Sequence, residues 1–124
     1  MIPSGLHILV VDREYLVAME AERLLVDALA CAVQIAMPHD FVAALAGQRY
    51  DLLVIDAGIV DFDGVEAIKA AQHAGTRLIF TTLTNDSMDR LPQFAGSAAV
   101  AKPFVDADLL AAVQSALALL EPDL

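Results

Sequence analysis

The sequence predicts a single α/β domain in which helices cover both faces of a parallel β-sheet. Short apolar runs of strand length alternate five times with longer segments of helical period along the 124 residues. Such alternation is typical of a doubly wound sheet, because each parallel strand needs a crossover to reach the next. Apolar residues make up 58% of the chain, above the usual ~45–50%, so a full core can form.

The first half of the chain contains two strand–helix pairs. Residues 6–11 are aliphatic and rich in β-branched side chains, which predicts a buried strand. Apolar residues then recur with a period of 3.6 across residues 16–29, which predicts an amphipathic helix. Residues 32–37 predict a second strand, and residues 41–46 predict a short helix that Gly47 closes.

The second half adds three strands and their helices. Residues 52–55 are the clearest buried strand, and a turn-rich loop over residues 58–64 leads to a helix over residues 65–74. The remaining elements, in order, are a strand at 78–82, a polar loop at 84–87, a short helix limited by Pro92, a strand at 98–101 and a final helix capped by Asp106.

The charge balance is strongly acidic, with 17 aspartates and glutamates, 7 lysines and arginines, and a formal net charge of −10. Nucleic acids and anionic membrane surfaces bind basic patches, so neither is an expected partner. No uncharged apolar stretch reaches the ~18 residues that span a bilayer, and no secretory signal is evident. The single cysteine, Cys31, cannot form an internal disulfide. We therefore expect a cytoplasmic protein.

Charged and polar side chains stand where the predicted strands end. Asp12 follows the first strand, Asp56 the third and Lys102 the fifth, while Thr82 ends the fourth. The carboxyl ends of parallel strands meet at one edge of the sheet, where ligands of doubly wound folds bind. Two carboxylates suit Mg²⁺, while a lysine and a threonine can hold a phosphoryl group. A carboxylate placed there can itself be the nucleophile in phosphoryl transfer.

Four segments carry a family resemblance: HILVVDRE from residue 7, DLLVIDAGIVDFDGVE from residue 51, LIFTTLT from residue 78 and AKPF from residue 101. In this order they resemble the receiver domain of bacterial two-component response regulators, over residues 7–120. The resemblance implies a flavodoxin-like, doubly wound sheet of five parallel strands in the order 2-1-3-4-5, with helices on both faces. It also implies a cis bond between Lys102 and Pro103. FTTLT and the segment from residue 91 to 104 look most like alphaproteobacterial single-domain receivers with a Phe-Ala-Thr-Gly signature.

The resemblance implies a role for each strand-end residue. Asp56 matches the aspartate that a histidine kinase or histidine phosphotransferase phosphorylates. Asp12 matches the first of two acids beside it, and the Gly58 carbonyl matches a further metal contact, so the implied Mg²⁺ ligands are Asp12, Asp56 and Gly58. Thr82 and Lys102 match the hydroxyl and the ammonium that hold the phosphoryl group.

Arg13 departs from the family pattern, because receivers carry their second acid at this position. The guanidinium could reach into the site and neutralise Asp12 or Asp56, which would weaken Mg²⁺ binding. It could equally point to solvent and pair with Asp61 or Asp63. The sequence leaves both alternatives open.

Three neighbouring positions also bear on the site. Glu14 could supply a replacement carboxylate, although it opens the first helix. Leu83 stands where receivers have a small residue, and its bulk could narrow entry for the phosphodonor. Ala99 stands where many receivers have an aromatic residue that rotates on phosphorylation. A signal must therefore leave by Thr82 and the loop after it, or by another surface.

Three functional hypotheses follow. The first is a phosphoacceptor in a phosphorelay: one receiver domain over residues 1–124 without an output domain, a monomer or weak homodimer that signals by protein contact and binds Mg²⁺ weakly. The second is a degenerate receiver that binds proteins without being phosphorylated. The third, a phosphatase of the haloacid-dehalogenase kind, is disfavoured because the first strand ends in Asp12, Arg13 and Glu14 rather than Asp-x-Asp. We therefore expect no enzymatic activity.

Overall fold

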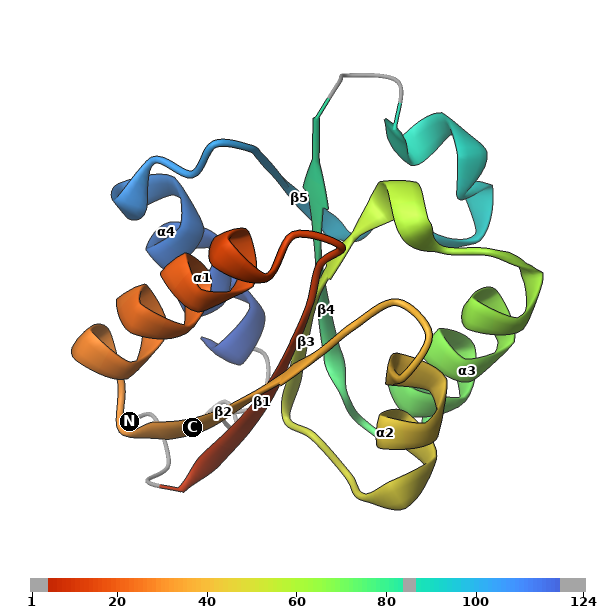
Figure 1. Cartoon of the computed structure of the whole chain (residues 1–124), viewed down its shortest axis with the longest axis horizontal. Helices are drawn as coiled ribbons and strands as arrows, with labels where there is room; N and C mark the ends of the chain where they lie inside the picture. Colours follow the sequence, from red (N-terminus) through yellow and green to blue (C-terminus); the bar gives the residue numbers. More distant parts are fainter. Residues whose placement is uncertain (1–4, 84–86, 119–124) are drawn as a thin grey trace.

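The computed structural model describes residues 5–83 and 87–118 and contains the expected five-stranded sheet (Figure 1). The strands are β1 Leu6–Val11, β2 Cys31–Ala36, β3 Leu52–Asp56, β4 Arg77–Thr82 and β5 Ala98–Ala101. Each neighbouring pair is parallel, and the order is β2-β1-β3-β4-β5. The predicted flavodoxin-like, doubly wound topology is confirmed.

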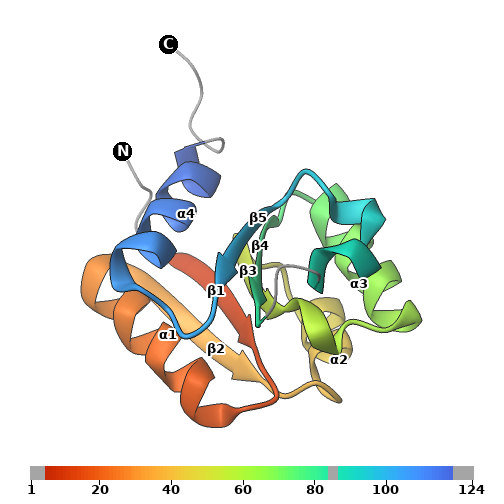
Figure 2. The same ribbon diagram turned by 90° about the horizontal axis from the view of Figure 1, so that it is seen from above.

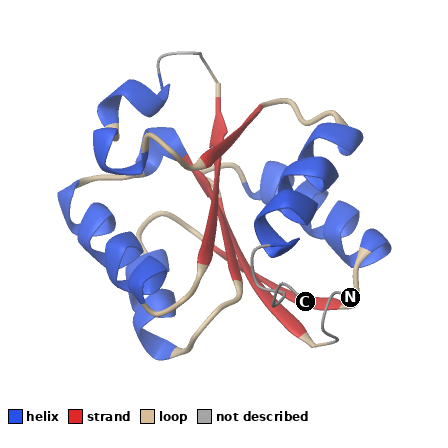
Figure 3. Cartoon of the chain, turned by 180° about the vertical axis from the view of Figure 1, so that it is seen from behind, coloured by secondary structure: helices blue, strands red, loops and turns tan. Residues whose placement is uncertain are grey.

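Helices cover both faces of this sheet, as the alternating pattern predicts. The α-helices are α1 Tyr15–Ala28, α2 Phe41–Gly47, α3 Phe62–His73 and α4 Asp106–Ala118, and the 3-10 helices are η1 Ala57–Ile59, η2 Ser87–Arg90 and η3 Pro92–Phe94. α1 and α4 lie on one face of the sheet, and α2 and α3 lie on the other (Figures 1 and 2). The view from behind shows the same three layers, with the strands between the helices (Figure 3).

The core consists of two apolar clusters, one on each face of the sheet. β3 contributes to both, because alternate side chains of a strand point to opposite faces. Leu52 and Val54 pack with α1 and α4, while Leu53 and Ile55 pack with residues of α2 and α3. Each of these four side chains is buried. Burial on both sides explains why β3 is an unbroken apolar run in the sequence.

The buried face of α1 agrees with the predicted one at Leu24 and Leu25 but differs from it at the start of the helix. The periodic residues of the predicted helix include Leu16, yet Leu16 is 79% exposed. The buried residues of α1 are Ala18, Ala21, Leu24 and Leu25. Because alanine is small, the first half of α1 can approach the sheet closely, and Leu16 is left in solvent in the first turn after β1.

The helix α3 begins at Phe62, three residues before the predicted start at Val65. Asp61 is its N-cap residue, and the Asp61 Oδ1 accepts a hydrogen bond of 2.8 Å from the Gly64 N–H. The glycines and aspartates of this segment favour a turn in the sequence, but the aspartate caps the helix and so extends it. The predicted loop over residues 58–64 is correspondingly shorter.

The segment between β4 and β5 contains the two 3-10 helices η2 and η3 in place of the short helix expected there. Pro92 stands at the start of η3, where its missing N–H does least harm. Two side chains anchor the segment: Leu91 and Phe94 are both buried, and the Phe94 ring lies 5.3 Å from the Phe80 ring between centroids. Residues 84–86 of the predicted polar loop lie outside the described residues.

Other boundaries differ by one or two residues. β2 begins at Cys31 rather than Ala32, and Asp106 is the first residue of α4 rather than its cap. The Cys31 thiol is partly buried, donates to the Leu25 carbonyl at 3.5 Å, and has a pKa raised by burial. Over the ranges that the structure describes, no helix is long and apolar enough to cross a membrane.

Gly64 tests how tightly α2 and α3 pack. A Cβ at residue 64 would lie 2.8 Å from Cζ of the buried Phe41 and 3.2 Å from the capping Asp61 Oδ1. We expect Gly64→Ala to lower the free energy of unfolding by about 1–3 kcal/mol in urea denaturation, because overpacking outweighs the gain in helix propensity of about 1 kcal/mol.

Gly47→Ala is the matched control, because a Cβ at this last residue of α2 would meet nothing within 4 Å. Its free energy of unfolding should stay level or rise by up to about 1 kcal/mol. Equal effects of the two substitutions would contradict the tight contact between α2 and α3.

Candidate functional site

Three strands bring two acids and a lysine together at the carboxyl edge of the sheet. Asp12 follows β1, Asp56 ends β3 and Lys102 follows β5. The Lys102 Nζ lies 2.9 Å from the Asp12 Oδ2 and 3.2 Å from the Asp56 Oδ2. Three of the strand-end residues named in the sequence therefore form one cluster.

This cluster is buried, so each of its charges needs a counter-charge nearby. The side chain of Lys102 is 5% exposed, and those of Asp12 and Asp56 are each 3% exposed. Removing one partner from a buried ion pair typically destabilises a protein by ~3–5 kcal/mol, because the remaining charge is uncompensated. The Lys102 ammonium is therefore the counter-ion that lets both carboxylates occupy this edge.

The backbone fixes the lysine in this position. The Lys102 N–H donates to the Thr82 carbonyl at 2.8 Å, which continues the ladder between β4 and β5 by one residue. The Lys102–Pro103 peptide bond is cis, as the family resemblance implies. The lysine thus leaves β5 at a fixed point and reaches across the end of β4.

The two oxygens of each carboxylate have different partners. The Asp12 Oδ1 accepts a hydrogen bond of 2.8 Å from the Glu14 N–H, and the Asp56 Oδ1 accepts one of 2.9 Å from the Gly58 N–H. The Asp56 Oδ2 is buried and accepts no hydrogen bond within the described residues. One oxygen of Asp56 is therefore held by its own loop, while the other faces the cations.

Arg13 points into the site rather than toward Asp61 or Asp63. Its Nε lies 3.5 Å from the Asp56 Oδ2, and no ion pair to either alternative partner is present in the described ranges. A Cβ at residue 58 would lie 2.9 Å from the Arg13 Nη2, so Gly58 leaves room for the guanidinium. The sequence leaves two orientations of Arg13 open, and the structure has the one in which the guanidinium enters the site.

The two threonines that end β4 occupy different environments. Thr82, the predicted phosphoryl contact, is partly exposed and accepts the Lys102 N–H through its carbonyl. Thr81 pairs with Asp56 in the sheet register and is buried. Its Oγ1 has no hydrogen-bond partner among the residues described. The sequence singles out Thr82, and the structure adds Thr81 beside it.

Arg90 is a site residue that sequence analysis missed. It lies in η2, and its Nη1 and Nη2 donate to the carbonyls of Ala57 and Val60 at 3.1 and 3.2 Å. Both of these residues are buried and flank Gly58 in the loop after Asp56. Arg90 therefore links the segment after β4 to the loop that holds the Asp56 carboxylate. No motif spacing marks such a long-range contact with backbone carbonyls.

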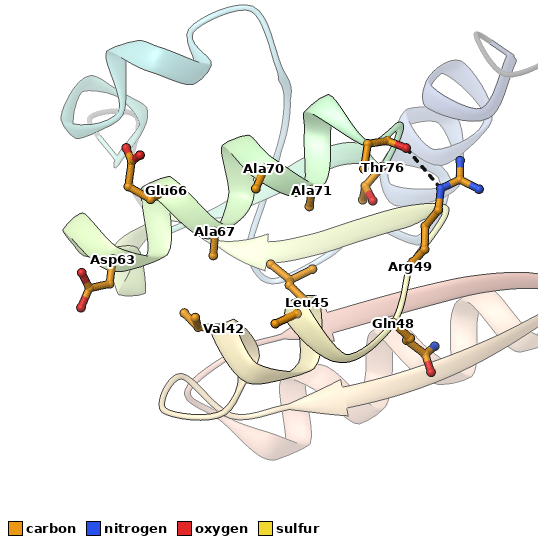
Figure 4. A pocket seen from close by; sticks show the side chains of 12 residues that line it. Val42, Leu45, Gln48, Arg49, Asp63, Glu66, Ala67, Ala70, Ala71 and Thr76 are labelled. Atoms are coloured by element: carbon orange, nitrogen blue, oxygen red, sulfur yellow. Dashed lines mark hydrogen bonds between the residues drawn. The ribbon is translucent and has the colours of Figure 1, made fainter.

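A hollow of about 800 Å³ lies between α2 and α3, away from the acidic cluster (Figure 4). Val42 and Leu45 of α2 face alanines of α3 across it, and the Arg49 Nε donates to the Ala74 carbonyl at 3.2 Å at one end. It shares no lining residue with the acidic cluster. Its walls are mainly apolar, so it contributes nothing to the chemistry of Asp56.

Comparisons with known proteins identify the family and the fold of this chain. The family model of the response regulator receiver domain matches residues 8–114. A response regulator receiver protein from Burkholderia phymatum is similar, with 24% identity, a TM-score of 0.75, and coverage of 92% of this chain and 96% of that chain. The signal receiver domain of an HD domain-containing protein from Pseudomonas fluorescens Pf-5 has 22% identity, a TM-score of 0.76, and coverage of 93% and 96%.

A CheY-like receiver domain protein from Methanospirillum hungatei JF-1 has 21% identity, a TM-score of 0.72, and coverage of 94% of this chain and 96% of that chain. At these identities the solved structures show the shared fold. Among curated proteins, none matches this chain.

A parallel sheet with two acids and a lysine at its carboxyl edge defines a receiver-type signalling module. The chain belongs to the response regulator receiver domain family of two-component systems. Receiver domains are phosphoacceptor signalling modules rather than enzymes, and they interact with histidine kinases or phosphotransferases and with downstream proteins. They generally bind Mg²⁺ at the acidic phosphorylation site.

The residues of this chain fit a tightly bound Mg²⁺ poorly. Asp12 and Asp56 supply the two carboxylates that Mg²⁺ accepts, and the Gly58 carbonyl is in the adjoining loop. Lys102 and Arg13, however, already balance both negative charges, so the cluster has no net formal charge to attract a dication. Within residues 5–83 and 87–118, no three acidic, histidine or cysteine side chains are grouped to hold a metal ion.

Arg90→Ala tests the link between the segment after β4 and the loop after Asp56. The substitution removes two charge-assisted hydrogen bonds to carbonyls of buried residues. We expect the free energy of unfolding to fall by about 1–2 kcal/mol and the Gly58 amide to exchange faster with deuterium.

Arg23→Ala is the control, because Arg23 pairs only with Glu20 and Asp27 on the surface of α1 within the described residues. Such exposed pairs contribute ~0–1 kcal/mol, and the Gly58 exchange rate should not change. An Arg90→Ala protein with parental Gly58 exchange would contradict the link.

Proposed function

We propose that Asp56 accepts a phosphoryl group from the phosphohistidine of a histidine kinase or histidine phosphotransferase. The observation that carries this proposal is the state of the Asp56 Oδ2, which is buried, accepts no hydrogen bond within the described ranges and lies 3.2 Å from the Lys102 Nζ. A carboxylate oxygen that accepts no backbone hydrogen bond can act as a nucleophile toward phosphorus. The ammonium beside it is placed to hold a phosphoryl oxygen, as is the Thr82 hydroxyl in our proposal.

The chemistry follows from the two oxygens of Asp56. The Oδ1 is occupied by the Gly58 N–H, so the Oδ2 is the nucleophile. An O–P bond forms at the Oδ2 while the P–N bond of the phosphohistidine breaks. The electron pair of that bond stays on the imidazole nitrogen, and a solvent proton makes the ring neutral. A carboxylate nucleophile carries its own negative charge, so the step needs no general base.

An exposed apolar surface beside the site suits the protein that delivers the phosphoryl group. Leu16 and Leu83 are 79% and 63% exposed and border a hollow of about 350 Å³ that Lys102 also lines. Glu14 and Glu20 stand at its margin. We infer that the kinase or phosphotransferase docks here through apolar side chains flanked by lysine or arginine. Apolar contact would supply affinity, and the glutamates would favour basic partners.

A degenerate receiver that binds proteins without phosphorylation is the second candidate. The Arg13–Asp56 ion pair favours it, because the guanidinium covers the acceptor oxygen. The Arg13 side chain is 53% exposed, however, and its Nε lies 3.5 Å from the Asp56 Oδ2, which is longer than an ordinary charge-assisted hydrogen bond. A phosphodonor can displace so weak a contact, and we therefore favour the phosphoacceptor.

We infer a monomer or a weak homodimer. The edge strand β5 has only four residues, and three of them are exposed alanines: Ala98, Ala99 and Ala101. Alanines offer little apolar area to a partner strand, and no aromatic side chain at residue 99 adds to it. The strongly acidic charge of −10 also opposes self-association.

Phosphorylation by a small donor tests the proposed function. Incubation with phosphoramidate or acetyl phosphate, with and without Mg²⁺, should add one phosphoryl group to the intact mass. Asp56→Asn should abolish the adduct, because an amide is not a nucleophile. Asp63→Asn, which alters an exposed aspartate in the first turn of α3, should leave the adduct unchanged. A parent protein without an adduct under every condition would leave the degenerate receiver as the function.

Arg13→Asp tests whether the guanidinium weakens Mg²⁺ binding. The substitution restores the acid pair of the family and removes a competing cation, so Mg²⁺ affinity should rise by about tenfold or more. The metal-free variant should melt below the parent, because a third carboxylate joins Asp12 and Asp56, and Mg²⁺ should recover the loss. Thermal melts across a Mg²⁺ titration measure this. Identical Mg²⁺ responses in parent and variant would show that Arg13 does not affect the metal.

A further inference from the structure

The Arg13 guanidinium lies at a defined position in the site, between Asp56 and Gly58. Two neighbours define it: the Nε lies 3.5 Å from the Asp56 Oδ2, and the Nη2 lies against Gly58 where a Cβ would come within 2.9 Å. Gly58 has no positive φ, so this glycine is needed for the space it leaves rather than for its backbone conformation. The guanidinium therefore lies beside the acceptor oxygen, in space that Gly58 leaves open.

Arg13 contributes the same net charge as the carboxylate and the divalent cation that occupy this place in the family pattern. In the family pattern, this position holds a carboxylate that helps to bind a divalent cation, and together they add one net positive charge. The Arg13 guanidinium adds one positive charge by itself. With Lys102, it balances Asp12 and Asp56 before phosphorylation, without any metal ion. The electrostatic balance around a phosphorylated Asp56 is thus the same in both arrangements.

The geometry of the guanidinium also suits this exchange. Arginine presents paired N–H donors in a plane and can bind two phosphoryl oxygens at once. The Nε lies 3.5 Å from the Asp56 Oδ2, and the half-exposed side chain also carries two terminal nitrogens that can donate to a ligand. The side chain is 53% exposed, so it has room to shift from the carboxylate toward an arriving phosphoryl group.

We propose that Arg13 takes the place of the divalent cation, so that Asp56 accepts a phosphoryl group without any metal ion. This inference rests on the proposed function and specifies which cations balance the charge of the phosphoryl group at the same site. Arg13 and Lys102 hold the phosphoryl oxygens while the Oδ2–P bond forms and the P–N bond of the donor breaks. The electron pair of that bond goes to the departing nitrogen, which takes up a solvent proton.

The rate of phosphorylation by phosphoramidate, followed by intact mass, tests this directly. In the parent protein, the rates in excess EDTA and in millimolar Mg²⁺ should agree within about twofold. Arg13→Gln should lose about tenfold or more in EDTA, because the guanidinium that stabilises the transition-state charge is gone. Arg13→Lys should recover part of that loss through its charge. Arg13→Asp should form the adduct only when Mg²⁺ is present.

Two controls separate this role from a structural one. Arg23→Gln removes an arginine that pairs with Glu20 and Asp27 on α1, and it should react like the parent. Gly58→Ala keeps Arg13 but fills the space beside it, so it should slow the EDTA reaction as Arg13→Gln does. Circular dichroism melts confirm that each variant is folded.

The outcomes distinguish this inference from the proposed function. A parent protein that forms the Asp56 adduct only with Mg²⁺ overturns the inference and leaves the phosphoacceptor intact. A phosphorylation rate of Arg13→Gln in EDTA that equals the parental rate also overturns the inference. The absence of any adduct with or without Mg²⁺ overturns both the inference and the proposed function.

Discussion

The buried Lys102 ammonium holds this site together, because two carboxylates lie within 3.2 Å of it in a region from which water is largely excluded. Without that counter-ion, Asp12 and Asp56 would each be a buried charge without compensation. The lysine reaches them from β5, across the end of β4, and its N–H is fixed by the Thr82 carbonyl. One side chain thus joins the ends of three strands to the acceptor loop, and the Asp56 Oδ2 beside it accepts no hydrogen bond from the described part of the chain.

The same electrostatic constraint explains why an arginine can stand in an acidic centre. A receiver with a second acid carries excess negative charge and depends on a metal ion to offset it. Arg13 offsets the charge from within the chain, and Gly58 provides the space that the guanidinium needs. The Arg13–Asp56 pair is half-exposed and can rearrange around a phosphoryl group. The buried pairs of Lys102 with Asp12 and Asp56 instead hold the strand ends in place.

The sequence predicts the parts of this structure that depend on burial and strand ends. The run at residues 52–55 is apolar throughout because both faces of β3 are covered, and Asp56 and Lys102 are evident because charges rarely enter such a sheet. The orientation of Arg13 could not be predicted, since a long side chain reaches either solvent or the site from the same backbone position. The bonds from Arg90 to backbone carbonyls also leave no trace in residue spacing.

The central claim is that the Arg13 guanidinium binds the phosphoryl group on Asp56, and NMR of the Arg13 Nε–H group tests it most directly. In metal-free buffer, phosphorylation should shift this ¹H–¹⁵N signal downfield and slow its exchange with water, because a charge-assisted hydrogen bond to a phosphoryl oxygen forms. The Arg23 signal, from a guanidinium paired with Glu20 and Asp27, should stay in place. An Arg13 signal that is unchanged on phosphorylation, with exchange as fast as that of a solvated guanidinium, would contradict the account.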